Sequence, residues 1–134
     1  MIVGLDTSVL VRVLVGEPEE LAARAASYLL ERQDAGDQVW VSDWVLAETY
    51  YALQHHYGVP KKDVLDALRG FLAAPGIRCP GEASQVLDTP RLETAKPGFV
   101  DRLIHRDYLR AGAVELVTFE RSVARLPQVR VLTA

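Results

Sequence analysis

The chain has 134 residues, of which 49% are hydrophobic and 25% charged, with a formal net charge of −3 at pH 7. These proportions are typical of a folded globular protein and exclude a disordered one. The length predicts a single domain over residues 1–134. No apolar run approaches the roughly 20 residues that a membrane span needs, and no basic segment precedes the apolar N-terminal stretch. The single cysteine, Cys79, excludes an internal disulfide and favours a cytoplasmic location.

The charge is unevenly distributed along the chain. Residues 1–95 carry 8 Lys and Arg against 14 Asp and Glu, whereas residues 96–134 carry 7 against 4. The C-terminal segment is therefore basic although the whole chain is acidic. This asymmetry predicts a local basic surface.

Apolar strands and helices alternate along the sequence. The first part predicts, in order, a strand at Ile2–Leu5, helices at 7–15 and 19–35, a strand at 39–41, and helices at 44–57 and 61–73. The second part predicts a short strand at 76–79, a helix at 99–111, a strand at 116–119, a helical turn at 122–125 and a strand at 129–132. Segment 82–95 stays ambiguous because Pro90 limits any helix there. The alternation predicts an α/β fold with a mainly parallel sheet.

Two acidic residues directly follow predicted strands. Asp6 lies just past the first strand, and Glu120 lies just past the strand 116–119. Ligands of parallel sheets bind beyond the carboxyl ends of the strands, so both positions suit a site. For Asp6 the alternative is an N-cap, in which the carboxylate accepts a hydrogen bond from the first helical turn.

Two more acids stand on predicted helices beside apolar residues. Glu48 shares a stripe with Val45 on a helix that we expect to be buried over most of its surface, so this acid should need a partner. Asp101 lies at the edge of a stripe that contains Ile104, although an exposed first-turn acid is the alternative. Clustered carboxylates repel one another unless a cation offsets their charge. Oxygen-only clusters suit Mg²⁺ or Mn²⁺, which can activate water for phosphodiester cleavage.

Four segments, in order and spacing, resemble the PIN domain family. They are GLDTSVLV, WVLAETYYAL, GFVDRLIH and ELVTFERSVARLPQVRVL. The length and the helical insert at 61–73 are most similar to VapC-type ribonuclease toxins of toxin–antitoxin pairs. The resemblance implies a three-layer α/β/α sandwich and a metal-dependent endoribonuclease that uses Mg²⁺ or Mn²⁺. It also implies a cognate antitoxin, an RNA substrate and a homodimer.

The resemblance places the family's acids at four positions. The catalytic and metal-binding set becomes Asp6, Glu48, Asp101 and Glu120. The family usually has aspartate where this chain has Glu120, whose side chain is one methylene longer. Ser122 and Gly98 stand where relatives often carry further acidic or amide groups. Thr7 and Ser8 match the family's hydroxyl pair, either as part of the site or as first-turn residues.

Other functions fit the sequence less well. A phosphoacceptor domain needs adjacent acids and a later lysine, and an aspartyl-nucleophile phosphatase needs a second acid where Ser8 stands. A PIN-like module that binds RNA or a partner, with catalysis weakened by Glu120, remains the main alternative.

The basic C-terminal segment contains a regular row of arginines. Arg102, Arg106 and Arg110 recur every four residues and should share one helical face, either as phosphate contacts or as a solvated stripe. His105 could share a metal with Asp101, but an isolated helical histidine is more often structural.

Overall fold

A parallel three-stranded sheet organises residues 1–81. The structure is a computed structural model that describes residues 1–133, and it divides into two units, residues 1–81 and the part from residue 82 onward. Over residues 1–133, no helix combines the length and apolar character that would let it cross a membrane.

The first unit contains three strands and four helices. In chain order they are β1 (Ile2–Gly4), α1 (Thr7–Val15), α2 (Glu19–Asp34), β2 (Gln38–Trp40), α3 (Asp43–His55), α4 (Lys61–Leu72) and β3 (Ile77–Arg78). The strands pair in parallel in the order β1-β2-β3, with Val3 opposite Val39 and Val39 opposite Ile77. Parallel neighbours need helical crossovers, and each connection supplies two helices.

Helices of this unit begin and end where the sequence provides capping groups. Ser42 caps α3 by accepting a hydrogen bond from the Val45 amide at 3.2 Å, a role for which serine is among the favoured residues. Gly16 ends α1 with a φ of 79°, and its amide donates to the Arg12 carbonyl. Glycine reaches this left-handed conformation without steric cost, so the chain can turn sharply toward α2.

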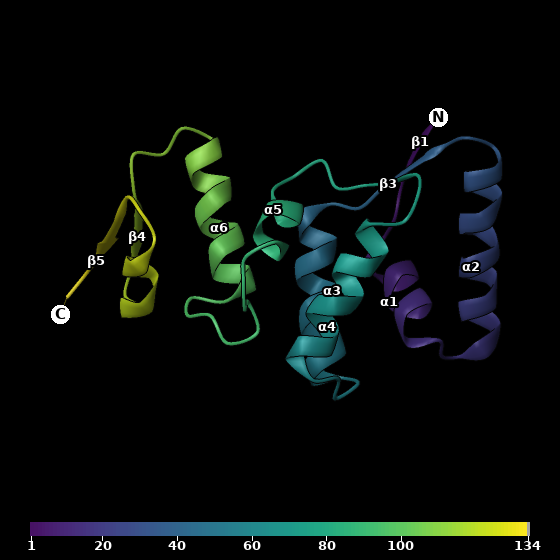
Figure 1. Ribbon diagram of the computed structural model, residues 1–134, viewed down its shortest axis with the longest axis horizontal. Coiled ribbons are helices and arrows are strands. Elements are labelled where there is room, and N and C mark those ends of the chain that lie inside the picture. The colour runs from purple at the N-terminus through teal and green to yellow at the C-terminus, as the bar shows by residue number, and fades with distance from the viewer. Residues whose placement is uncertain (134) are drawn as a thin grey trace. The chain divides into compact units, whose positions relative to one another are not determined.

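The core of the first unit lies between its sheet and its helices. Figure 1 shows α1 beside α2 and α3 beside α4, and α1 also contacts α3. The largest fully buried side chains of this unit are Leu10, Val41, Leu46, Val64, Leu65 and Leu68. They come from α1, the end of β2, α3 and α4, so burial of apolar surface fixes the helices around the sheet.

Over residues 82–133, the second unit contains two helices, a 3₁₀ turn and two strands. They are α5 (Ala83–Leu87), α6 (Phe99–Arg110), β4 (Leu116–Thr118), η1 (Arg121–Arg125) and β5 (Val129–Val131). Strands β4 and β5 pair in parallel, with Leu116 opposite Val129. The ambiguous segment thus forms the short helix α5 followed by turns. The predicted mixed α/β class with parallel pairing is confirmed.

Candidate functional site

Asp6 lies beyond the carboxyl end of β1, and its side chain is exposed. It occupies the N-cap position of α1, but its carboxylate accepts no backbone hydrogen bond there. Instead Oδ2 accepts a hydrogen bond of 3.1 Å from the Ser8 hydroxyl. The predicted capping role of the Asp6 side chain is therefore wrong: the carboxylate bonds the Ser8 hydroxyl and no amide of the first turn. The carboxylate remains open to a ligand.

Glu48 lies in the middle of α3 and is exposed, contrary to the expectation of a buried acid. The buried face of α3 consists of Val45, Leu46, Thr49, Tyr50 and Leu53. The helical period puts Glu48 on the opposite side from this face. Its partner is Thr7, whose hydroxyl donates a hydrogen bond of 2.8 Å to Glu48 Oε1.

The first turn of α1 thus holds two of the predicted acids. Thr7 holds Glu48, and the flanking residues Asp6 and Ser8 pair with each other. Two exposed carboxylates fit Mg²⁺ or Mn²⁺, because Mg²⁺ is commonly held by one or two carboxylates with waters and substrate phosphates as further ligands. Over residues 1–133, no group of three or more His, Cys, Asp or Glu side chains has an arrangement that could hold a metal. Asp6 and Glu48 line different pockets, so the first unit offers them as separate oxygen donors on either side of the first turn of α1.

Asp101 lies in the first turn of α6 and is exposed. The buried face of α6 contains Phe99, Leu103 and His105, whereas Ile104 is 43% exposed. The predicted apolar stripe through Ile104 is therefore wrong, since the helix buries the neighbouring face. Asp101 is the favoured kind of residue for the positive end of a helix dipole.

Glu120 lies just past β4, at the residue before η1, and is exposed. Its side chain makes no capping hydrogen bond, while its backbone amide donates to the Thr118 hydroxyl at 3.0 Å. Glu120 therefore lies past a parallel strand, as the sequence predicted, and its carboxylate caps no helix.

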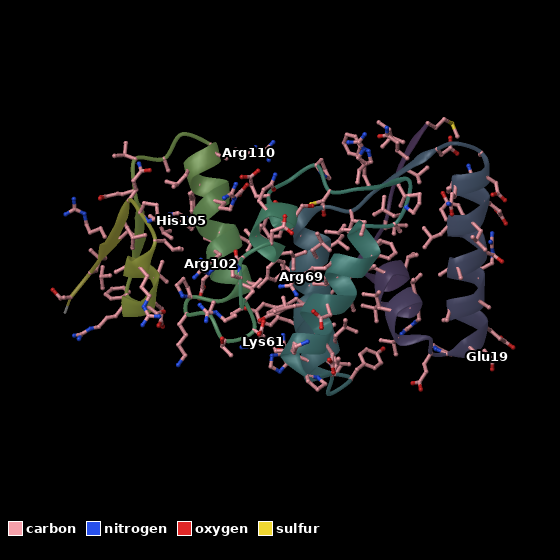
Figure 2. The ribbon with its side chains drawn as sticks, in the orientation of Figure 1. Glu19, Lys61, Arg69, Arg102, His105 and Arg110 are labelled. Atoms are coloured by element: carbon pink, nitrogen blue, oxygen red, sulfur yellow. The ribbon has the colours of Figure 1, made fainter. Side chains whose placement is uncertain are left out.

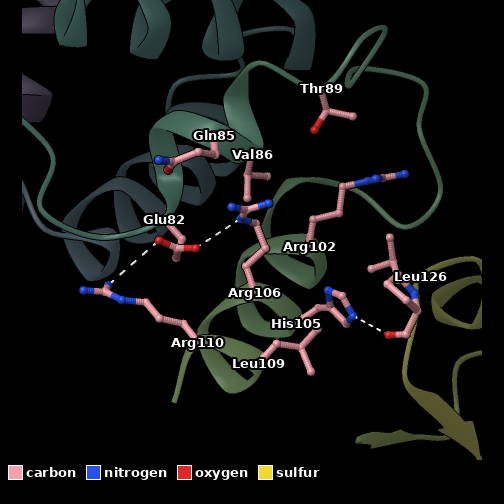
Figure 3. A pocket seen from close by; sticks show the side chains of 11 residues that line it. Glu82, Gln85, Val86, Thr89, Arg102, His105, Arg106, Leu109, Arg110 and Leu126 are labelled. Carbon is pink, nitrogen blue, oxygen red and sulfur yellow. Dashed lines mark hydrogen bonds and ion pairs between the residues drawn. The ribbon is translucent and has the colours of Figure 1, made fainter. Parts of the chain in front are cut away.

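The arginine row of α6 lines a pocket of about 600 Å³ within the second unit. Figure 3 shows Glu82 between Arg106 and Arg110, at 3.3 Å and 4.0 Å. The Arg102 Nε donates to the Pro97 carbonyl at 2.7 Å. Figure 2 shows Arg102 and Arg110 along the same helix. Internal partners thus engage all three, and Glu82 offsets part of their charge.

His105 has a structural role in the second unit. Its side chain is 4% exposed, and its Nε2 lies 2.7 Å from the Pro127 carbonyl, to which it donates. This bond ties α6 to the segment before β5. The hydrogen bond satisfies the buried ring nitrogen of His105. His105 therefore has the structural role that was predicted as the alternative to metal binding.

Sequence reasoning missed an aromatic pair next to Glu48. Tyr51 and His55 follow Glu48 by three and seven positions, and their rings stack with centroids 5.9 Å apart. The sequence also carried no sign that the Asp43 carboxylate accepts a hydrogen bond from the Cys79 thiol at 3.4 Å and packs against Gly81. The only available signal for the aromatic pair was the spacing of Glu48, Tyr51 and His55, which puts these residues on one face of a helix.

Each unit of this α/β protein places an exposed acid beyond the carboxyl end of a parallel strand, Asp6 after β1 and Glu120 after β4, which is where parallel sheets bind ligands. A family model for the PIN domain matches residues 3–128, which include parts of both units. The chain therefore belongs to the PIN domain family, and the resemblance seen in its sequence is confirmed at the level of the family. PIN domains are generally metal-dependent nuclease modules. No curated protein matches the chain.

Proposed function

We propose that this protein is a metal-dependent endoribonuclease with Asp6, Glu48, Asp101 and Glu120 as its acidic site. One observation carries the proposal most directly: the Thr7 hydroxyl fixes Glu48 of α3 at the turn that carries Asp6. Two carboxylates from separate elements are thereby anchored to one helical turn while both remain exposed. A buried structural pair would not keep its oxygens accessible.

The side chains of the chain itself supply binding and orientation. Ser8 orients Asp6, and Thr7 orients Glu48, so that each retains an oxygen for a divalent cation. Bound Mg²⁺ or Mn²⁺ would lower the pKa of a water and stabilise phosphoryl oxygens. Hydrogen-bonded supports of this kind fix metal-binding carboxylates in a productive orientation.

We further propose that the chain forms a single nuclease domain over residues 1–134 and acts in the cytoplasm as the toxin of a toxin–antitoxin pair. Its substrate would be RNA, its partner a cognate antitoxin, and its assembly a homodimer. Support comes from the overall length and from helix α4 (Lys61–Leu72), which coincides with the insert that is similar in VapC-type toxins.

Cleavage of RNA tests the catalytic part of the proposal. Wild-type protein should cut RNA with Mg²⁺ or Mn²⁺, and EDTA or Asp6→Asn should abolish cleavage. Asp63→Asn, which changes an exposed acid in the first turn of α4, is the matched control and should cut normally. Cleavage that persists in EDTA and in Asp6→Asn would overturn the proposal.

Growth measurements test the toxin role separately. Expression of the wild type should arrest growth, expression of Asp6→Asn should not, and co-expression of a small protein from the neighbouring reading frame should relieve the arrest. Normal growth with an active nuclease would exclude the toxin role alone.

A second function is favoured by Glu120. Its longer side chain departs from the aspartate usual in the family, so a module that binds RNA or a partner with weak catalysis is the alternative. RNA binding without cleavage in either the wild type or Glu120→Asp would support it.

A further inference from the structure

The exposed face of α3 carries aromatic side chains next to Glu48. Tyr51 is 48% exposed although most tyrosines bury their rings, and His55 is exposed beside it. The two rings stack at an interplanar angle of 20°. Both side chains lie on the same helical face as Glu48, at spacings of three and seven residues.

The aromatic pair is supported from the core. The ring of Tyr50, which is 5% exposed, meets the Tyr51 ring edge-on with centroids 5.3 Å apart and an interplanar angle of 68°. A buried ring therefore restrains Tyr51 on one side, and His55 packs against it on another. Because Tyr51 is held before any ligand arrives, a planar ligand that stacks on it would pay little ordering entropy.

The pair and the acid line one pocket. A pocket of about 410 Å³ is bounded by Thr7, Glu48, Tyr51, Ala52, His55 and His56. Along the axis of α3, Tyr51 lies only about 4.5 Å from Glu48, since a helix rises 1.5 Å per residue. A group stacked on Tyr51 would therefore be within one nucleotide of a phosphate bound at Glu48.

We propose that Tyr51 and His55 form a stacking platform for an unpaired base of single-stranded RNA, one that neighbours the phosphate to be cut. This proposal rests on the proposed nuclease function. A base offers the flat face that stacked aromatic rings bind best, whereas base faces inside a duplex are already stacked and unavailable. The ring nitrogens of His55 and His56 add hydrogen-bonding groups at the rim of the same pocket.

The platform accounts for two features together. It gives an exposed aromatic pair a ligand, and it positions that ligand beside Glu48, which the Thr7 hydroxyl holds. It also predicts a preference for single-stranded over duplex RNA, because only an unpaired base can enter the pocket.

Binding of a fluorescent RNA tests the platform without cleavage. The probe is a short single-stranded RNA containing 2-aminopurine, whose emission falls on stacking, mixed with the full chain in Ca²⁺ so that binding is read apart from catalysis. Wild type should quench the probe and bind it more tightly than the duplex form. Tyr51→Leu should lose the quenching and bind about tenfold more weakly, within the range for removing one stacking ring.

Matched variants keep the test specific. Tyr51→Phe retains the ring and should behave as wild type, and Tyr108→Leu, which removes a tyrosine that is 53% exposed on α6, should leave quenching intact. Should Tyr51→Leu fail to fold by circular dichroism, His55→Leu serves in its place, with a partial loss expected.

The outcomes separate this platform from the nuclease proposal. Quenching by wild type and its loss in Tyr51→Leu would establish that Tyr51 stacks on an unpaired RNA base. If the same wild-type protein cut no RNA, the nuclease proposal would be overturned and the stacking site would stand as an RNA-binding site. If Tyr51→Leu leaves the quenching, the RNA affinity and the KM for cleavage unchanged, the platform is overturned. Cleavage by the wild type would still support the nuclease proposal in that case, and this face of α3 would be left to a protein partner.

Discussion

The hydroxyl of Thr7 donates a hydrogen bond of 2.8 Å to Glu48, a residue 41 positions away in the chain. This bond joins the first turn of α1 to the middle of α3. The adjacent Ser8 hydroxyl forms the corresponding bond to Asp6 at 3.1 Å. The two hydroxyls after the first acid thus hold a carboxylate each, which connects a short sequence motif to the geometry of the site.

Loss of the Thr7 hydroxyl should impair catalysis more than folding. Thr7→Val keeps the shape of the side chain but leaves Glu48 without its donor, so metal-dependent cleavage should fall about 10- to 100-fold, as for other supports of metal ligands. Thr7→Ser should retain most of the activity. Cleavage rates across a Mg²⁺ titration provide the measurement. Equal rates for Thr7→Val and the wild type would contradict the positioning role.

The length of the Glu120 side chain should set its contribution. Removal of its charge in Glu120→Gln should lower the apparent Mg²⁺ affinity at least about tenfold, because affinity follows the number of anionic ligands. Glu120→Asp restores the residue usual in the family and should cut at least as fast as the wild type. The side chain makes no capping bond, so neither change should alter the melting temperature greatly. If Glu120→Gln binds Mg²⁺ as the wild type does, Glu120 is no ligand.

Local patterns predicted the elements of this fold well. The ends of α1 and α3 follow from Gly16 and Ser42, whose conformational and hydrogen-bonding properties act within a few residues. The class also follows, because strands separated by helical crossovers can pair in parallel. These signals act between residues that are close together in the chain, so they can be recognised from the sequence alone.

Which face of a helix is buried could not be predicted as well. Helix α3 is apolar on several sides, and packing against α1 and α4 decides that Tyr50 is buried while Glu48 and Tyr51 are exposed. The partners of polar groups depend on distant residues too. The bond from Thr7 to Glu48 and the bond from His105 to the Pro127 carbonyl both join separate elements, so no local pattern encodes them.

The buried hydroxyl of Thr49 offers a test of packing in α3. Thr49 is 0% exposed, and within residues 1–133 its hydroxyl has no hydrogen-bond partner. Thr49→Val removes this unpaired group while it keeps a branched side chain, so it should raise the free energy of unfolding by about 1 kcal/mol. Urea unfolding measures the change. Thr49→Ala, which loses volume as well, should be less stable than Thr49→Val, and a destabilised Thr49→Val would mean that the hydroxyl is paired.

Asp37 should make the stability of the first unit depend on acid pH. Its side chain is 8% exposed and lies 3.0 Å from the amino group of Met1 and 2.7 Å from Arg32. The hydrogen bond from that amino group, and then the charges of the amino group and Arg32, hold the pKa of Asp37 below its ordinary value of 3.8.

Since the folded-state pKa is the lower one, Asp37 contributes its stability fully above pH 4 or so and loses it as the pH falls through the folded value. Asp37→Asn should therefore be less stable than the wild type at pH 7, and the difference should shrink steadily below about pH 4. Urea midpoints over a pH series measure it. Asp34→Asn, a change in an exposed acid at the end of α2, is the control and should show a smaller, flatter difference. A gap between Asp37→Asn and the wild type that stays constant down to pH 3 would show that the ionised carboxylate does not stabilise the fold.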